Sequence, residues 1–497
     1  MSDLDRRSLL RAGAAAVTVA PLLTFAPAEA GQTRTKVFKG AFRNADTADW
    51  HYLPFRVPRG VRKIAVRYSY HPTDTGAGFS VNVVDIGIFD PSGTDLGNAK
   101  GFRGWSGGAR REFFLTRTRA TPGYLAGPIT PGTWHIALGP YLIVPPGTPY
   151  KVEVTLHFGE PGPDFVPVPA PQEVPGTGPG WYRGDLHLHT VHSDGRRTQP
   201  QLQAAALEAG LDLMGSSEHN TCSATRTWGR HVAPGFLVVN GEEVTTRTGH
   251  WLALGLPPGT WIDWRYRADD GLLAQFTEQV HQLGGVAVAA HPKAAGGGNG
   301  WAYGYDDGVD AIEVWNGPWG SDDQATVATW HALLVNGTYL PAIGNSDAHN
   351  DTQTVGLAQT VYHLDTLSTA AVLDAIRGGH AWIAESSAVD LTFTASAGES
   401  TAGCGDHLGA APDATATVKL DVTGVPGCVA QLRGPTSALG GVLADETGTI
   451  TLQVDVPVAD AAFVRAEVRR TPSAVDPLGN LTALPMVALT NPVFLGA

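Results

Sequence analysis

Two histidines and an aspartate stand close together in the stretch Trp181-Tyr-Arg-Gly-Asp-Leu-His-Leu-His-Thr-Val-His-Ser-Asp-Gly195. The alternation of apolar and polar residues predicts a strand over 182–189. His187 and His189 then point to the same face, because side chains alternate along a strand. Asp194 follows just beyond that strand. Two imidazoles and a carboxylate at a strand end suit a metal ion better than a hydrophobic core.

Similar polar residues recur where four further strands are expected to end. The groups are Glu218-His219-Asn220 after 211–214, Glu242, Glu243 and His250 after 236–239, His291-Pro292 after 286–290, and Asp347-Ala-His349 after 340–343. Taken singly, each group has an ordinary explanation, such as a turn or an exposed charge pair. Parallel α/β folds gather their active sites at the carboxyl ends of strands, so the recurrence predicts one shared site.

The residue types in this predicted site indicate its chemistry. Imidazole and carboxylate ligands suit Zn, Mn or Fe, and the absence of cysteine ligands argues against a structural zinc site. The ligands outnumber the needs of one ion, so we expect two or three divalent ions. Adjacent ions lower the pKa of a bound water and polarise an ester, which favours hydrolysis without a covalent intermediate.

The segment 181–386 that carries these residues alternates between strand and helix patterns. Helices are expected over 198–209, 272–283, 322–335 and 367–376, each followed by a turn or a strand. This alternation predicts an α/β domain with a parallel sheet, either open or closed into a barrel.

The flanking segments show a different pattern. Short period-two runs separated by turns over 31–160 predict an antiparallel sandwich or jelly-roll-like domain, and 387–497 predicts a second sandwich-like domain. Residues 161–180 are rich in proline and glycine and are interpreted as a linker. The chain is thus expected to be multidomain, α/β plus β.

The N-terminus has the features of an export signal. Arg6-Arg7 precedes an apolar run and the small-x-small site Ala28-Glu29-Ala30, so residues 1–30 are predicted to be a cleaved twin-arginine signal peptide. The run is short and rich in alanine for a membrane anchor, and no other membrane span is expected. The mature protein would therefore be periplasmic or extracellular.

Charge and cysteine content limit the other possibilities. A net charge of −13 argues against nucleic-acid binding, which needs a basic face. Of the three cysteines, Cys404 and Cys428 could form a disulfide in an oxidising compartment or remain two buried thiols, and Cys222 is interpreted as a pocket-wall residue. Neither the oligomeric state nor the metal identity follows from the sequence.

The order of the motifs resembles a known superfamily. His-x-His, Ser-Asp-Gly, Glu-His-Asn, Gly-x-Glu with a later Gly-His, Ala-His-Pro and Ser-Asp-Ala-His are similar to the motifs of the PHP (polymerase and histidinol phosphatase) superfamily. Three flanking pieces, at 102–107, 120–124 and 488–492, resemble its carbaryl-hydrolase-like secreted branch. The resemblance implies a distorted (β/α)7 barrel, flanked by the two β domains, with a trinuclear site.

The resemblance also implies a distribution of ligands. His187, His189, Glu243 and Asp347 would hold one ion, Glu243 with His250 and His291 a second, and Asp194, His219 and His349 a third. Glu243 and Asp347 would be catalytic by positioning the hydroxide, and the Gly-x-Glu spacing selects Glu243 over Glu242. Glu218 replaces the usual aspartate and is expected to orient His219. Asp185 is expected behind the ligands or at the start of the strand.

These inferences predict a metal-dependent hydrolase that cleaves a small-molecule ester. A phosphoester is preferred, with Arg183, Arg196, Arg197 or Lys293 as candidate phosphate partners. A carbamate or carboxylic ester is the alternative, with an aromatic wall from Trp228, Trp251, Trp301, Tyr303, Trp315 or Trp319, although these aromatics could be core residues. A non-catalytic surface-binding protein is the third possibility. The loops 102–108 and 121–124 could cap the mouth of the site.

Overall fold

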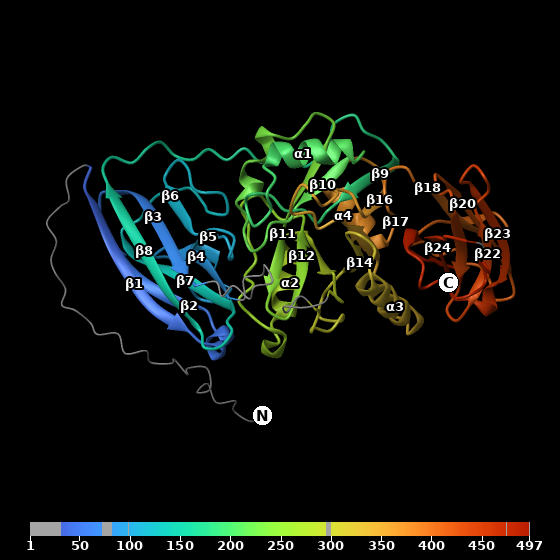
Figure 1. The fold of residues 1–497 in the computed structure, drawn as a ribbon. Helices are drawn as coiled ribbons and strands as arrows, with labels where there is room; N and C mark the ends of the chain where they lie inside the picture. The colour runs from blue at the N-terminus through green and yellow to red at the C-terminus, as the bar shows by residue number, and fades with distance from the viewer. Residues whose placement is uncertain (1–30, 72–81, 98, 295–299, 474, 497) are drawn as a thin grey trace, which may run out of the picture.

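The computed structural model describes residues 31–71, 82–97, 99–294, 300–473 and 475–496 of the 497-residue chain. Three β-rich bodies follow one another along the chain and lie side by side (Figure 1). The predicted signal peptide at 1–30 lies outside the described residues. Within the described part, no helix has both the length and the apolar character to cross a membrane.

The N-terminal body consists of two four-stranded antiparallel sheets. The first has the order β1 (Thr33–Phe42), β8 (Thr148–Phe158), β3 (Val61–Tyr70) and β6 (Glu112–Thr116). The second has the order β2 (His51–Val57), β7 (Gly132–Leu142), β4 (Val83–Phe89) and β5 (Phe102–Trp105). Apolar side chains from both sheets, among them Ile64, Ile86 and Trp134, form one buried core. Period-two alternation thus produces the expected sandwich.

The second sheet has another face that packs on the central body. Along β4, Val84 and Ile86 belong to the sandwich core, whereas Phe89 joins a separate aromatic cluster. In that cluster Phe89 lies next to Trp261 of the central body, with ring centroids 6.4 Å apart. The two bodies therefore share a buried apolar interface.

A 14-stranded sheet runs through the central and C-terminal bodies. Its central part has the order β15 (Ala342–Asn345), β14 (Ala311–Asn316), β13 (Val286–Ala290), β12 (Gly249–Leu254), β11 (Leu237–Thr246), β10 (Leu213–Ser216), β9 (Gly180–Asp185), β16 (Gln359–Leu364) and β17 (Ala381–Ala384). β9, β10 and β11 are parallel, and so are β13, β14 and β15. The carboxyl ends of these six strands point toward the same end of the sheet.

Two features of this sheet differ from the expected parallel barrel. β12 is antiparallel to β11 and β13, and β16 is antiparallel to β9. The strand order of the described chain is open, since β15 approaches β9 only near an isolated bridge between Leu188 and Ala348. A closed (β/α)7 barrel is therefore not observed. The residues that follow His250 in β12, 251–254, are all apolar, and such a run carries no periodicity that reveals a strand's direction.

Four α-helices accompany the central sheet, as the sequence predicts. They are α1 (Gln199–Glu208), α2 (Leu273–Gln282), α3 (Ser321–Val335) and α4 (Thr369–Gly378). The ends of α4 follow from local chemistry. The Ser368 side chain accepts a hydrogen bond from the Ala371 amide, and Gly379 ends the helix with a φ of 69°.

The C-terminal body continues the large sheet. Beyond β17 the order is β25 (Met486–Thr490), β24 (Phe463–Arg470), β21 (Cys428–Arg433) and β22 (Ala438–Leu443), with β26 (Val493–Phe494) beside β24. A second sheet has the order β19 (Ser400–Ala402), β18 (Asp390–Ala397), β20 (Thr415–Thr423) and β23 (Ile450–Pro457). Val361 and Trp382 of the central strands pack into the same core. Cys222, Cys404 and Cys428 are free, buried thiols.

Candidate metal centre

The nine residues that the sequence singled out as ligands lie together at one end of the central sheet. His187 and His189 come just after β9, which is shorter than predicted, and Asp194 lies in the following turn. The remaining six approach from the neighbouring strands. They are His219 after β10, Glu243 on β11, His250 on β12, His291 after β13, and Asp347 and His349 after β15. Their donor atoms form three of the four groups in this region that could hold a metal ion, and the fourth combines His187 and His291 with Glu313.

The first group contains His187, His189, Glu243 and Asp347. The Nε2 atom of His187 lies 3.1 Å from Glu243 Oε2 and 3.3 Å from Asp347 Oδ1. The Nε2 atom of His189 lies 3.3 Å and 3.0 Å from the same two oxygens. Two imidazole nitrogens and two carboxylate oxygens thus converge on one point.

The second group uses the other oxygen of the same glutamate. Glu243 Oε1 lies 2.9 Å from His250 Nδ1 and 3.2 Å from His291 Nε2. Glu243 therefore faces two different sets of histidines with its two oxygens. This is the geometry expected of a carboxylate that bridges two ions.

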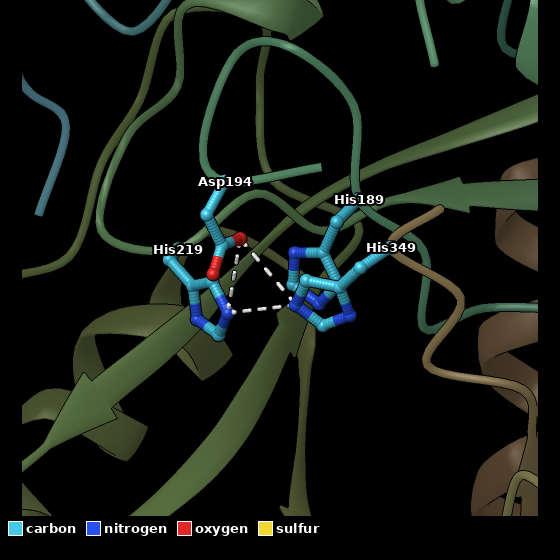
Figure 2. A group of neighbouring side chains, drawn as sticks. All are labelled: His189, Asp194, His219 and His349. Carbon is cyan, nitrogen blue, oxygen red and sulfur yellow. Dashed lines mark hydrogen bonds and ion pairs between the residues drawn. The ribbon is translucent and has the colours of Figure 1, made fainter. Parts of the chain in front are cut away.

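The third group contains His189, Asp194, His219 and His349 (Figure 2). His189 and Asp194 come from the segment after β9, and the other two follow β10 and β15. Asp194 Oδ1 lies 3.6 Å from His219 Nε2 and 3.4 Å from His349 Nε2. The two Nε2 atoms are 3.3 Å apart. His349 Nδ1 lies 2.8 Å from the backbone oxygen of Asp347, which directs Nε2 toward Asp194.

The donor atoms of the first group are better placed to bind a metal ion than to form hydrogen bonds with one another. His187 Nε2, His189 Nε2, Glu243 Oε2 and Asp347 Oδ1 are buried and form no hydrogen bond of acceptable geometry among the described residues, despite separations near 3 Å. Buried polar atoms left unpaired in this way cost free energy. A shared cation at the point of convergence would satisfy all four.

The backbone is strained at this end of the sheet. Asn220, His291 and Asp347 have φ values of 53°, 30° and 49° and are the non-glycine residues with positive φ in the described chain. Such conformations cost roughly 1–3 kcal/mol each and cluster at functional sites. All three lie within or beside the donor groups, so the strain serves to aim these side chains.

Attraction between carboxylates and imidazoles shifts the pKa values of His187, His219 and Glu243 against the effect of burial. Burial alone would lower the pKa of His219, but the carboxylates of Glu243 and Asp194 outweigh burial and raise it to about 10. Burial would likewise lower the pKa of His187, and Asp347, Glu313 and Glu243 raise it. Burial would raise the pKa of Glu243, but the surrounding histidines hold it well below its usual range. In the metal-free protein these imidazoles therefore carry protons that a cation would displace.

One buried carboxylate at the site, Glu313, was missed by the sequence analysis. It lies in the middle of β14, and its Oε1 accepts hydrogen bonds from His187 Nδ1 at 3.0 Å and from Asn345 Nδ2 at 2.8 Å. Its other oxygen accepts from the amide of His291 at 2.9 Å. Glu313 thereby holds the His187 ring with Nε2 toward the cluster. A single glutamate within the apolar run 311–315 was the available signal.

Glu218 and Asp185 both lie behind the cluster, but Glu218 does not act as expected. Its carboxylate accepts hydrogen bonds from Thr190 and from Ser193 Oγ, the latter at 2.6 Å, and the expected contact with His219 is not formed in the described structure. The longer glutamate side chain reaches the turn after His189 instead. Asp185 accepts from the amides of Ser346 and Gly356 and so joins β9 to the loop that carries Asp347.

The donor groups form one wall of a cavity of about 650 Å³. The facing wall comes from the N-terminal body and includes Trp50, Tyr70, Asp85, Trp105 and Tyr141. The expected capping role of 102–108 thus holds for Trp105 to Gly108. The loop 121–124 lies elsewhere, where the Gly123 amide donates to Ser223 Oγ.

The substrate-contact candidates from the sequence are replaced by others. None of the four cationic candidates or six aromatic candidates lines this cavity in the described structure. Arg183, for example, binds Asp390 at the other end of the sheet, and Trp251 is a core residue. The cavity instead contains Arg111 and Arg247, and its aromatic wall is formed mainly by the N-terminal body.

Comparisons with known proteins give one family match. Residues 336–381, which include Asp347 and His349, match the family model described as PHP-associated. No curated protein matches the chain. The match covers a short part of the chain, and together with the donor cluster it supports a metal-dependent hydrolase.

Two solved structures show distant similarity. One is a two-domain protein from Bacteroides vulgatus, described as containing a predicted PHP-like metal-dependent phosphoesterase, with 15% identity and a TM-score of 0.35 over 67% of this chain and 100% of its own. The other is an amidohydrolase from Chromobacterium violaceum, with 19% identity and a TM-score of 0.27 over 35% of this chain and 89% of its own. At these TM-scores neither similarity defines the fold or the activity of this chain.

Proposed function

We propose that this protein is a PHP-type metallohydrolase that cleaves a small-molecule ester, with a phosphoester as the preferred substrate. The observation that carries the proposal is Glu243, whose two oxygens face two separate sets of histidines. The donors would hold two or three divalent ions, with Zn, Mn or Fe matching imidazole and carboxylate ligands.

Divalent ions held in these groups would supply a Lewis acid for the ester oxygen and make a water molecule acidic enough to provide hydroxide near neutral pH. The chain's own residues prepare the site for this chemistry. Glu313 fixes the His187 ring from behind, and Asp185 fixes the loop before Asp347. The N-terminal body forms the facing wall of the cavity.

Two guanidinium groups in the cavity favour a negatively charged ester. Arg247 donates from Nη1 to the Pro140 carbonyl, and its Nη2 is buried without a hydrogen-bond partner in the described structure. Its guanidinium lies 4.6 Å from the centre of the Trp50 ring, and that of Arg111 lies 3.8 Å from the centre of the Tyr70 ring. Guanidinium groups held in this way suit phosphate oxygens.

A carbamate or carboxylic ester, as in the carbaryl-hydrolase-like branch, is the second candidate. The aromatic side chains Trp50, Trp105 and Tyr141 favour it, since they offer an apolar surface to an uncharged substrate. Assays of p-nitrophenyl phosphate, bis-p-nitrophenyl phosphate and 1-naphthyl N-methylcarbamate, run side by side with Mn or Zn, distinguish the two. Preference for the carbamate would contradict the phosphoester assignment, and failure on all three would contradict the proposed function.

We also propose export through the twin-arginine pathway, on the basis of residues 1–30 alone. Replacing Arg6 and Arg7 by lysine should leave the full-length precursor in the cytoplasm. Cell fractionation followed by N-terminal sequencing checks this outcome. Export of the double variant at the wild-type rate would contradict the proposal.

A further inference from the structure

Asp85 is a carboxylic acid that the N-terminal sandwich presents to the cavity. It lies on β4 between Val84 and Ile86, which both point into the sandwich core. Because side chains alternate along a strand, Asp85 projects from the opposite face. That face lines the cavity whose other wall contains Asp194, His219 and Glu243.

The surroundings of Asp85 leave its carboxyl group available. Its side chain is half-buried at the cavity, and no hydrogen bond or ion pair to it is present among the described residues. Gly107 and Gly108 leave room beside it, since a β-carbon at either position would lie 3.7 Å from Asp85 Oδ1. That separation is an ordinary van der Waals contact, so both glycines border the carboxyl group on the cavity side.

Burial and the neighbouring charges together place the pKa of Asp85 near neutral pH. Burial is the largest influence and raises its pKa to about 7, while the positive charges of Arg247 and His219 lower it and Asp194 raises it further. A carboxyl group in this range can give up a proton near neutral pH and be protonated again between turnovers.

We propose that Asp85 protonates the leaving-group oxygen of the ester, so that the N-terminal sandwich supplies a catalytic residue to a site whose candidate metal ligands belong to the central body. This inference rests on the proposed ester hydrolysis. As the oxygen of water forms its bond to phosphorus or carbon, the bond to the leaving oxygen breaks and its electron pair stays on that oxygen. The leaving oxygen takes the proton of Asp85, and the proton released by water restores the acid through solvent.

The placement of Asp85 also sets the orientation of the substrate. Trp50, Trp105 and Tyr141 line the same wall as Asp85. The leaving group would therefore lie against the N-terminal body, and the phosphoryl or acyl group would face the donor cluster. Esters with a planar, apolar leaving group fit this wall best.

Two esters that differ only in the leaving group test this assignment. The phenyl and p-nitrophenyl esters of the preferred acid are assayed with the Mn-loaded forms of wild type, Asp85→Asn and the control Glu153→Gln, a half-buried residue on β8 that does not line the cavity. p-Nitrophenolate leaves without protonation, whereas phenolate needs an acid. We expect Asp85→Asn to lose roughly 10²–10⁴-fold in kcat/KM on the phenyl ester, but less than about tenfold on the p-nitrophenyl ester. Equal losses on both esters would overturn the assignment.

Two further measurements separate this role from a structural one. The wild-type rate on the phenyl ester should fall at high pH relative to the rate on the p-nitrophenyl ester, and Asp85→Asn should lose this difference while keeping its metal content. Infrared difference spectra of the metal-free proteins should show a protonated carboxyl band that Asp85→Asn lacks. Absence of that band at pH values below the pKa would overturn the assignment. If wild type hydrolyses neither ester, the proposed function itself fails, and the role of Asp85 with it.

Discussion

Two buried clusters of charged side chains in this protein are arranged in opposite ways. In the C-terminal body, Arg465, Glu467 and Arg469 alternate along one face of β24. Glu467 accepts from Arg465 Nη1 at 2.6 Å and from Arg469 Nε at 2.7 Å. In the candidate metal centre, Glu243 and Asp347 lie as close to histidines, yet Glu243 Oε2 and Asp347 Oδ1 have no hydrogen bond of acceptable geometry among the described residues.

The difference distinguishes a structural charge cluster from a ligand site. Both carboxylate oxygens of Glu467 have donors, and the guanidinium of Arg465 lies over the Trp330 ring at 5.2 Å. The Glu467 carboxylate is therefore satisfied without a ligand, although Arg469 Nη2 is buried with no hydrogen-bond partner among the described residues. In the metal centre, by contrast, Glu243 Oε2 and Asp347 Oδ1 are buried without a hydrogen bond among the described residues, and a cation at their point of convergence would be their partner.

The largest expected effect is the loss of activity in Glu243→Ala. This change removes a donor from both groups that use Glu243 and should lower kcat/KM by more than about 10³-fold, while the protein still folds. Steady-state kinetics with circular dichroism checks both parts. The control is the exposed helix variant Glu278→Gln, and retained activity in Glu243→Ala would contradict the bridging role.

Glu467→Leu should lower the stability of the protein and leave the metal centre unchanged. It leaves two buried guanidinium groups without their carboxylate and should lower the free energy of unfolding by roughly 3–5 kcal/mol. Metal content per folded chain should not change. Denaturant unfolding of Glu467→Leu beside the exposed control Glu446→Gln gives the measurement. An unchanged unfolding midpoint would show that the cluster is not structural.

A smaller effect is expected from Glu313→Gln. Glutamine can still accept one hydrogen bond from His187, but it lacks the negative charge that favours the metal-ligating ring. Loss of such a partner typically weakens metal binding by about 10–100-fold. Competition with a chromogenic chelator measures the affinity. Wild-type affinity in the variant would mean that Glu313 does not orient His187.

The two clusters should also respond differently to pH. In the metal-free centre, His219 has a pKa of about 10, so metal binding must release protons and should strengthen as pH rises through neutrality. Burial would raise the pKa of Glu467, but Arg465 and Arg469 hold it at about 2. Its folded pKa lies below its unfolded value near 4.3, so its stabilisation is present above pH 4.3 and lost as pH falls toward 2.

Calorimetry tests the predicted proton release on metal binding, and acid unfolding tests the predicted loss of stabilisation by Glu467 at low pH. Isothermal titration in buffers of different ionisation enthalpy reports the protons released by metal. Acid titration of wild type beside Glu467→Leu isolates the contribution of Glu467. Metal binding without proton release would contradict the first expectation, and identical acid transitions would contradict the second.

The candidate ligands could be predicted from the sequence because they lie where strands end. His187, Glu243 and Asp347 are polar residues beside apolar runs, and runs of this kind are easy to recognise. Glu313 was missed because it lies inside such a run. Asp85 was missed because its role depends on the contact between two bodies, about which local periodicity carries no information.

The strand topology could be predicted only in part. The parallel strands β9 to β11 follow from the alternation of strands and helices. The reversal at β12 depends on hydrogen bonding to β11 and β13, and the apolar run 251–254 is compatible with either direction. The continuation of the sheet from β17 into β25 joins residues far apart in the sequence, which no local pattern predicts.

Metal content provides the most direct test of the central claim that the unpaired donor cluster is a multinuclear metal site. Elemental analysis of the purified full chain, wild type beside Glu243→Ala and Glu467→Leu, gives the number of ions per folded molecule. We expect two or three transition-metal ions in wild type and Glu467→Leu, and the loss of at least one ion in Glu243→Ala. Wild-type protein that retains no ion after loading with Mn or Zn, or Glu243→Ala with the full complement, would contradict the account.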